Sequence, residues 1–151
     1  MASNSVEAPV AAKIEQISPT LTREYLYDGR IVVFKVTSIS RQTIDLWAEI
    51  VREAVVSWTP DHWYLALHDY SEGNISLTPY ARAKGTELFN LRPDIRGSIA
   101  FVLRKTFIAQ VMHLYLRSQR HDYYQNQIFF SRTEGLSWLV ARMNTPWVKE
   151  R

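Results

Sequence analysis

Apolar and polar positions alternate over short distances between residues 25 and 36, which predicts a β-hairpin. Tyr25 and Tyr27 flank a leucine before the turn, and the run from Ile31 to Val36 is β-branched and aromatic. Between them, Asp28-Gly29 is a strong signal for a two-residue turn, because both positions of such a turn need positive φ angles. We therefore expect the first structured unit to be an antiparallel hairpin.

Four later segments show the period of a helix, with apolar residues three or four positions apart and polar residues on the opposite face. Thr78-Pro79 reads as the N-cap and first residue of the second helix. Ser131 and Glu134 are spaced as a capping box for the last one. The predicted helices cover residues 40–58, 78–88, 106–120 and 131–143.

Three runs between these helices are almost continuously apolar, which is typical of strands covered on both faces in a parallel sheet. They are HWYLALHD (62–69), SIAFVL (98–103) and QIFF (127–130). In the second helix Ala81, Gly85 and Leu88 share one face. Since two of these three side chains are very small, we expect that helix to lie close on the sheet.

The predicted order is β-β-α-β-α-β-α-β-α, and repeated β-α-β units require right-handed crossovers. The fold class is therefore α/β, with one mixed β-sheet that opens with a hairpin and carries four helices. We expect a flexible arm over residues 1–20, one domain over 21–143 and a short tail over 144–151.

Composition removes several classes of chemistry. The chain has 151 residues and no cysteine, which excludes disulfides, thiolate metal sites and cysteine nucleophiles. Five glycines cannot supply a P-loop or G-x-G-x-x-G motif, and the four histidines show no metal-ligand spacing. We therefore expect no enzyme, no cofactor and no metal site.

Hydropathy and charge bear on location and partners. No apolar run approaches the roughly 20 residues of a membrane span, and the N-terminus does not resemble a secretion signal, so we expect a cytoplasmic protein. The net charge is +3, from 8 basic and 11 acidic residues in 1–91 and 10 and 4 in 92–151. This mildly basic balance predicts a basic face in the second half but does not favour nucleic-acid binding.

Polar residues follow the predicted strands where the carboxyl ends of a parallel sheet meet, the edge at which ligands gather in open α/β folds. They are Asp69 and Ser71 after one strand and Arg104 and Lys105 after the next. The helix start at Thr78 directs free N–H groups to the same edge. These five residues are our candidates for an anion site, or for a phosphate carried on Ser71 or Thr78.

The third predicted helix is apolar on more than one face. Ile108, Met112, Tyr115 and Leu116 exceed what a one-sided amphipathic helix needs, and Phe107, Val111 and Leu114 add to the surplus. The surplus is either core or an interface with a partner or a second copy. We name the first four residues as interface candidates.

Four stretches together resemble the STAS domain, the fold of sporulation anti-sigma-factor antagonists, in its SpoIIAA-like branch. They are YLYDGRIVVFKV, WYLALHDYS, LTPYARAKG and IFFSRTEGLSWL, and the resemblance covers residues 21–143. It implies a bacterial, non-enzymatic regulatory module that binds a partner protein. In the phosphorylated antagonists a serine lies at the start of the helix after the central strand, and Thr78 is the matching hydroxyl here.

Two hypotheses follow. The first is a regulatory protein-interaction module, switched by phosphorylation at the start of the second helix, with a protein partner or self-association as a dimer. The alternative is a small-molecule or lipid-binding domain of the SpoIIAA-like or Sec14-like type, supported by the aromatic surplus. It requires a pocket of a few hundred Å³.

Overall fold

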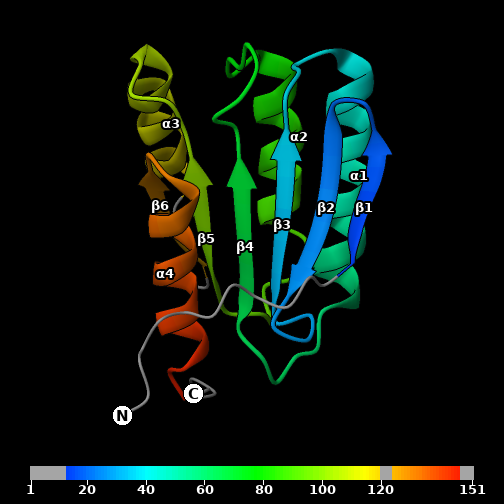
Figure 1. The fold of residues 1–151 in the computed structure, drawn as a ribbon, viewed down its shortest axis with the longest axis vertical. Coiled ribbons are helices and arrows are strands. Elements are labelled where there is room, and N and C mark those ends of the chain that lie inside the picture. The colour runs from blue at the N-terminus through cyan, green and yellow to red at the C-terminus, as the bar shows by residue number, and fades with distance from the viewer. Residues whose placement is uncertain (1–12, 120–123, 147–151) are drawn as a thin grey trace.

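The computed structural model describes residues 13–119 and 124–146, which form one six-stranded sheet flanked by four helices (Figure 1). The strands lie side by side in chain order. The first three pair antiparallel and the last four pair parallel, with β3 shared. The strands are β1 (Ile14–Ser18), β2 (Leu21–Leu26), β3 (Ile31–Val36), β4 (Tyr64–Asp69), β5 (Gly97–Val102) and β6 (Tyr124–Phe129).

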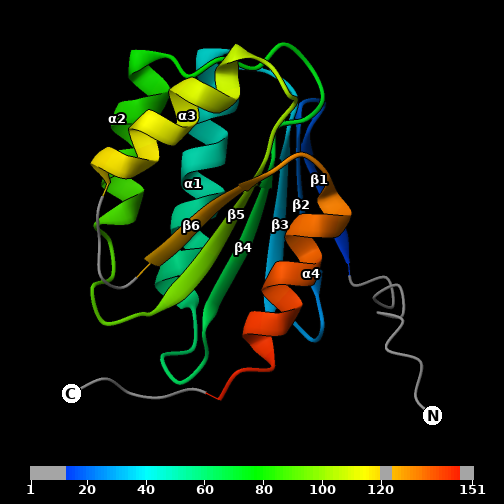
Figure 2. The same cartoon turned by 90° about the vertical axis from the view of Figure 1, so that its left-hand side faces the viewer.

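The helices cover the two faces of the sheet unequally. Figure 2 shows three of them on one side and the last alone on the other. The helices are α1 (Arg41–Ser57), α2 (Pro79–Phe89), α3 (Phe107–Ser118) and α4 (Arg132–Met143). This arrangement confirms the predicted α/β class, the mixed sheet and the four helices.

The hairpin of β2 and β3 forms where the turn chemistry predicts it. Tyr27, Asp28 and Gly29 have φ angles of 53°, 56° and 80°, so the turn with positive φ includes the predicted Asp28-Gly29 pair but begins one residue earlier. Arg30 N–H donates to the Tyr27 carbonyl across the turn at 3.1 Å. Leu26 pairs with Ile31 immediately beyond it, so the turn fixes the register of the whole hairpin.

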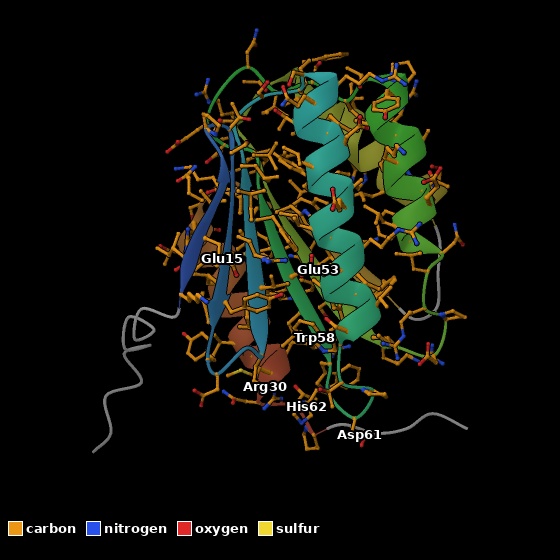
Figure 3. The ribbon with its side chains drawn as sticks, turned by 90° about the vertical axis from the view of Figure 1, so that its right-hand side faces the viewer. Glu15, Arg30, Glu53, Trp58, Asp61 and His62 are labelled. Atoms are coloured by element: carbon orange, nitrogen blue, oxygen red, sulfur yellow. The ribbon has the colours of Figure 1, made fainter. Side chains whose placement is uncertain are left out.

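The prediction of a flexible arm over residues 1–20 is wrong for its last part, because Ile14–Ser18 form the edge strand β1. A polar contact explains how so weakly apolar a segment is held. Arg23 of β2 is only 8% exposed, and its guanidinium lies 2.9 Å from Glu15 and 3.4 Å from Glu53. Figure 3 shows these two glutamates on β1 and on α1. Residues 1–12 of the predicted arm lie outside the described residues.

Two apolar cores result from this layering. The larger lies under α1, α2 and α3, and the smaller lies under α4. Alternate residues of β4 belong to different cores, as the pleat of a strand requires: Tyr64 and Ala66 enter the larger core, and Leu65 and Leu67 the smaller.

The predicted tail is described only as far as residue 146. Within it, the carbonyl of Thr145 accepts a hydrogen bond from Trp63 Nε1 at 3.0 Å. The chain after α4 therefore returns to the loop before β4.

Candidate functional site

An apolar cavity of about 80 Å³ lies between the sheet and the three helices of the larger core. Its floor is the helix-covered face of β4, β5 and β6, and its walls come from α1, α2, α3 and the loop after β4. The residues that line it include Trp47, Tyr64, His68, Ala81, Phe101 and Met112.

His68 is the one histidine among the residues that line this cavity, and an aromatic ladder holds it. Phe34 and Phe101 are its register partners on the two neighbouring strands. The His68 ring stacks on both, with ring centroids 5.1 Å and 5.3 Å away. Three parallel strands therefore present three stacked rings, and the imidazole in the middle is 4% exposed.

The hydrogen bonds of His68 settle its tautomer. Trp47 Nε1 lies 3.2 Å from His68 Nδ1, and an indole N–H can only donate. Nδ1 must therefore accept, and the proton of the neutral ring is on Nε2. The Tyr70 hydroxyl, 3.3 Å from the same Nδ1, donates to it as well. No described residue accepts a hydrogen bond from Nε2.

Burial keeps this imidazole neutral. Desolvation lowers the pKa of His68 from 6.5 to about 3, because the charged ring would lose its hydration among apolar side chains. Desolvation likewise raises the pKa of Tyr64 and of Tyr70 well above the usual value. The Tyr64 hydroxyl is buried at the cavity wall and makes no hydrogen bond with the described residues. The site thus offers neutral polar atoms in apolar surroundings.

The small residues of α2 help to create the cavity. We expected Ala81 and Gly85 to bring the helix close to the sheet, but both line the open space instead. A Cβ atom on Gly85 would come within 2.6 Å of the Tyr115 hydroxyl of α3. The small side chains therefore allow α3 to approach α2 and leave room below.

The predicted anion site is only partly assembled. Asp69 accepts from the Ser71 hydroxyl at 2.6 Å and from the Ser71 N–H at 3.0 Å. Arg104 Nε donates to the Ser71 carbonyl at 2.6 Å. Three of the five predicted residues thus form one network at the carboxyl end of the sheet.

The other two candidates have separate contacts. The Thr78 hydroxyl oxygen accepts from Ala81 N–H at 3.1 Å, which makes Thr78 the N-cap of α2 as predicted. The Lys105 ammonium lies over the Phe130 ring, 5.5 Å from its centroid. Among the described residues, no hydrogen bond or ion pair joins Thr78 to either cation.

The four interface candidates on α3 face the protein interior. Ile108, Met112 and Tyr115 line the cavity, and Leu116 packs against the larger core. Met112 is 5% exposed and has no surface to offer a partner in this conformation. The four interface candidates are therefore not on the exposed side of α3. The exposed large apolar residues of this helix are Phe107 and Leu114.

The residues that line the cavity and the role of His68 were not predicted from the sequence. Pleat alternation could have placed His68 on the same face as Tyr64 and Ala66, and a histidine inside an apolar strand is an available signal. The ladder partners Phe34 and Phe101 could not be identified without the strand order. Trp47 lies within the first predicted helix (40–58), but its hydrogen bond to His68 depends on how that helix lies on the sheet.

Comparisons with protein-family models, with curated proteins and with solved structures find no match for this chain. The STAS resemblance therefore stays a prediction. Within residues 13–119 and 124–146, no helix is long and apolar enough to cross a membrane. The same residues contain no group of three or more acidic or histidine side chains placed to hold a metal ion.

Proposed function

We propose that the chain binds a small, neutral, largely apolar molecule in the cavity between the sheet and helices α1–α3. The observation that carries the proposal is His68, a neutral buried imidazole on the cavity wall whose Nε2–H has no partner among the described residues. The Tyr64 hydroxyl of the same strand also lines the cavity, is fully buried and makes no hydrogen bond with the described residues, and a buried polar group without a partner is costly. An acceptor oxygen on a bound molecule would remove that cost.

Cavity size limits the ligand. One water molecule needs about 10–15 Å³ of such space, so about 80 Å³ accommodates several water-sized groups. A single ring or a short aliphatic chain with one carbonyl or ether oxygen matches this space and its lining. A charged ligand does not, because an unpaired charge among these side chains would be strongly disfavoured.

Two probes that differ by one oxygen test the proposal. Benzaldehyde and toluene would be titrated into the full chain while the indole N–H signal of Trp47 is followed by NMR. We expect benzaldehyde to bind more tightly, because its oxygen can accept from His68. Absence of any shift with either probe would overturn the proposal.

A cavity-filling variant supplies the matched control. Ala81→Leu places a larger side chain at the cavity wall, whereas Ala48→Leu makes the same change in the charged groove between α1 and α2. Only Ala81→Leu should weaken binding of the probes. Equal binding by both variants would mean that the probes occupy another place.

We also propose, as a second candidate, the phosphorylation-dependent regulatory module that the STAS resemblance implies. The supporting observation is the Arg104 guanidinium, which lies against Ser71 at the carboxyl end of the sheet. A phosphate on Ser71 would meet that cation. Neither candidate function involves catalysis.

One measurement separates the two candidates. The intact mass of the chain purified from its own cells would be determined under native conditions. A covalent phosphate that maps to Ser71 or Thr78, or a stoichiometric partner protein, supports the regulatory module. A noncovalently bound small molecule supports ligand binding, and a bare chain supports neither.

A further inference from the structure

The outer face of α3 is exposed and apolar. Phe107 is 75% exposed and Leu114 is 66% exposed, which places them among the most exposed large apolar residues of the described chain. Val111 lies between them and is half-buried. Positions 107, 111 and 114 follow the i, i+4, i+7 spacing of one helix face. They form an apolar stripe along the side of α3 that faces away from the cavity.

One cation lies at each end of this apolar stripe. Lys105 precedes the helix, Arg117 lies in its last turn, and both are exposed. Lys105 also lies over Phe130, which is itself exposed. Residues 95–118 contain no aspartate or glutamate. The charge on this part of the chain therefore has one sign.

The apolar stripe is not needed for packing within the described chain. The opposite side of α3 already supplies Ile108, Met112 and Tyr115 to the cavity and the larger core. Exposed phenylalanine and leucine on a helix with flanking cations are the features that place a helix in the plane of a bilayer surface. Anionic headgroups attract the cations while the apolar side chains enter the acyl boundary.

We propose that the outer face of α3, with Phe107 and Leu114 at its centre and Lys105 and Arg117 at its ends, binds the surface of anionic lipid membranes. A bilayer is favoured over a protein partner because a convex apolar ridge bordered by charges of one sign fits a fluid anionic surface without a shaped groove. This site is separate from the cavity, and the proposal stands whether or not the cavity binds a ligand.

The test is sedimentation of the full chain with vesicles. Vesicles of phosphatidylcholine and phosphatidylserine would be compared with vesicles of phosphatidylcholine alone at low salt. We expect binding to the mixed vesicles that weakens as salt is raised. The double variant Phe107→Asp/Leu114→Asp should bind at least about tenfold more weakly, given what burial of one large apolar side chain contributes. Lys105→Gln/Arg117→Gln should weaken binding about 25-fold, at roughly fivefold for each cation.

Two controls make the same changes elsewhere. Val56→Asp alters another exposed apolar residue, on α1, and Arg52→Gln removes an exposed cation from the same helix. Both should bind the mixed vesicles as the wild type does. Because Phe107 and Leu114 are exposed, circular dichroism of the double variant should show an intact fold.

Three results would overturn the proposal. One is no binding of the wild type to mixed vesicles. Another is unchanged binding of Phe107→Asp/Leu114→Asp. The third is a wild type that is dimeric in solution and binds no vesicles, with a monomeric double variant, which would assign the face to a second copy of the chain.

Discussion

The buried imidazole of His68 makes the stability of the fold depend on pH. In the folded chain its pKa is lowered to about 3, whereas in the unfolded chain it returns to about 6.5. Between these values the unfolded chain binds one more proton than the folded chain. The free energy of unfolding must therefore fall as the pH drops from above 6.5 toward 3.

The size of the effect follows from the two pKa values. Each unit of difference corresponds to 1.36 kcal/mol, so the full difference is about 5 kcal/mol once the pH is below 3. Between pH 8 and pH 5 the same linkage relation gives a loss of about 2 kcal/mol. That is a large share of the roughly 5–15 kcal/mol by which a domain of this size is stable.

The assay is urea unfolding at pH 8 and pH 5, followed by tryptophan fluorescence. The test variant is His68→Gln, which cannot titrate and retains a side-chain oxygen to accept from Trp47. It should be less stable than the wild type at both pH values, because it loses the stacking on Phe34 and Phe101. Its loss between pH 8 and pH 5 should nevertheless be about 2 kcal/mol smaller than that of the wild type.

His113→Gln is the matched control, because His113 is exposed on α3. Its pH dependence should equal that of the wild type. The acidic groups whose pKa is lowered, Glu15 and Asp94, titrate below this range and do not confuse the comparison. If the wild type and His68→Gln lost the same free energy between pH 8 and pH 5, the neutral buried imidazole would be refuted.

Two further predictions concern the backbone. Gly73 has a φ of 77°, and a Cβ atom there would lie 2.1 Å from the Thr37 carbonyl oxygen. Gly73→Ala should therefore lower the free energy of unfolding, measured by urea unfolding, by about 2–3 kcal/mol. Gly29 also has a positive φ, but nothing lies near the position of its missing Cβ atom, so Gly29→Ala should lower the free energy of unfolding by only about 1 kcal/mol. Equal losses in the two variants would refute the contact between residue 73 and the Thr37 carbonyl. Thr78→Ala should lower the free energy of unfolding by about 1 kcal/mol, because the helix loses its N-cap, whereas Thr78→Asp should keep the cap and its stability. A higher melting temperature for Thr78→Ala than for Thr78→Asp would contradict the capping role.

Local chemistry explains what could be predicted from the sequence. The Asp28-Gly29 turn, the Thr78 cap and the Ser131 cap each depend on residues within four positions of one another, and the structure contains all three. Of the predicted capping box only the Ser131 half is present, because the Glu134 carboxylate accepts from the Ser131 hydroxyl. Helix periodicity and the buried strands depend on similarly short spacings. The α/β class follows from the order of these elements.

Features that depend on distant residues were missed. β1 is held by Arg23, whose partners Glu15 and Glu53 come from different elements. The cavity lies beside Ala81 and Gly85 of α2, and Gly85 meets Tyr115 of α3, which no single-helix pattern can indicate. Likewise, the tautomer of His68 depends on Trp47, which lies 21 positions away in the sequence.

The unequal covering of the sheet has a consequence for synthesis of the chain. α4 leaves the ribosome after all six strands of the sheet, and it brings Leu139 onto a face that includes Ile31, Val33 and Leu67. Until residues 132–143 emerge, these strands can complete the side under α1–α3 while the other side stays open to water. The nascent chain thus passes through a stage in which one face of the sheet is covered and the other is exposed. A chain released at that stage would expose an apolar surface that is prone to aggregation.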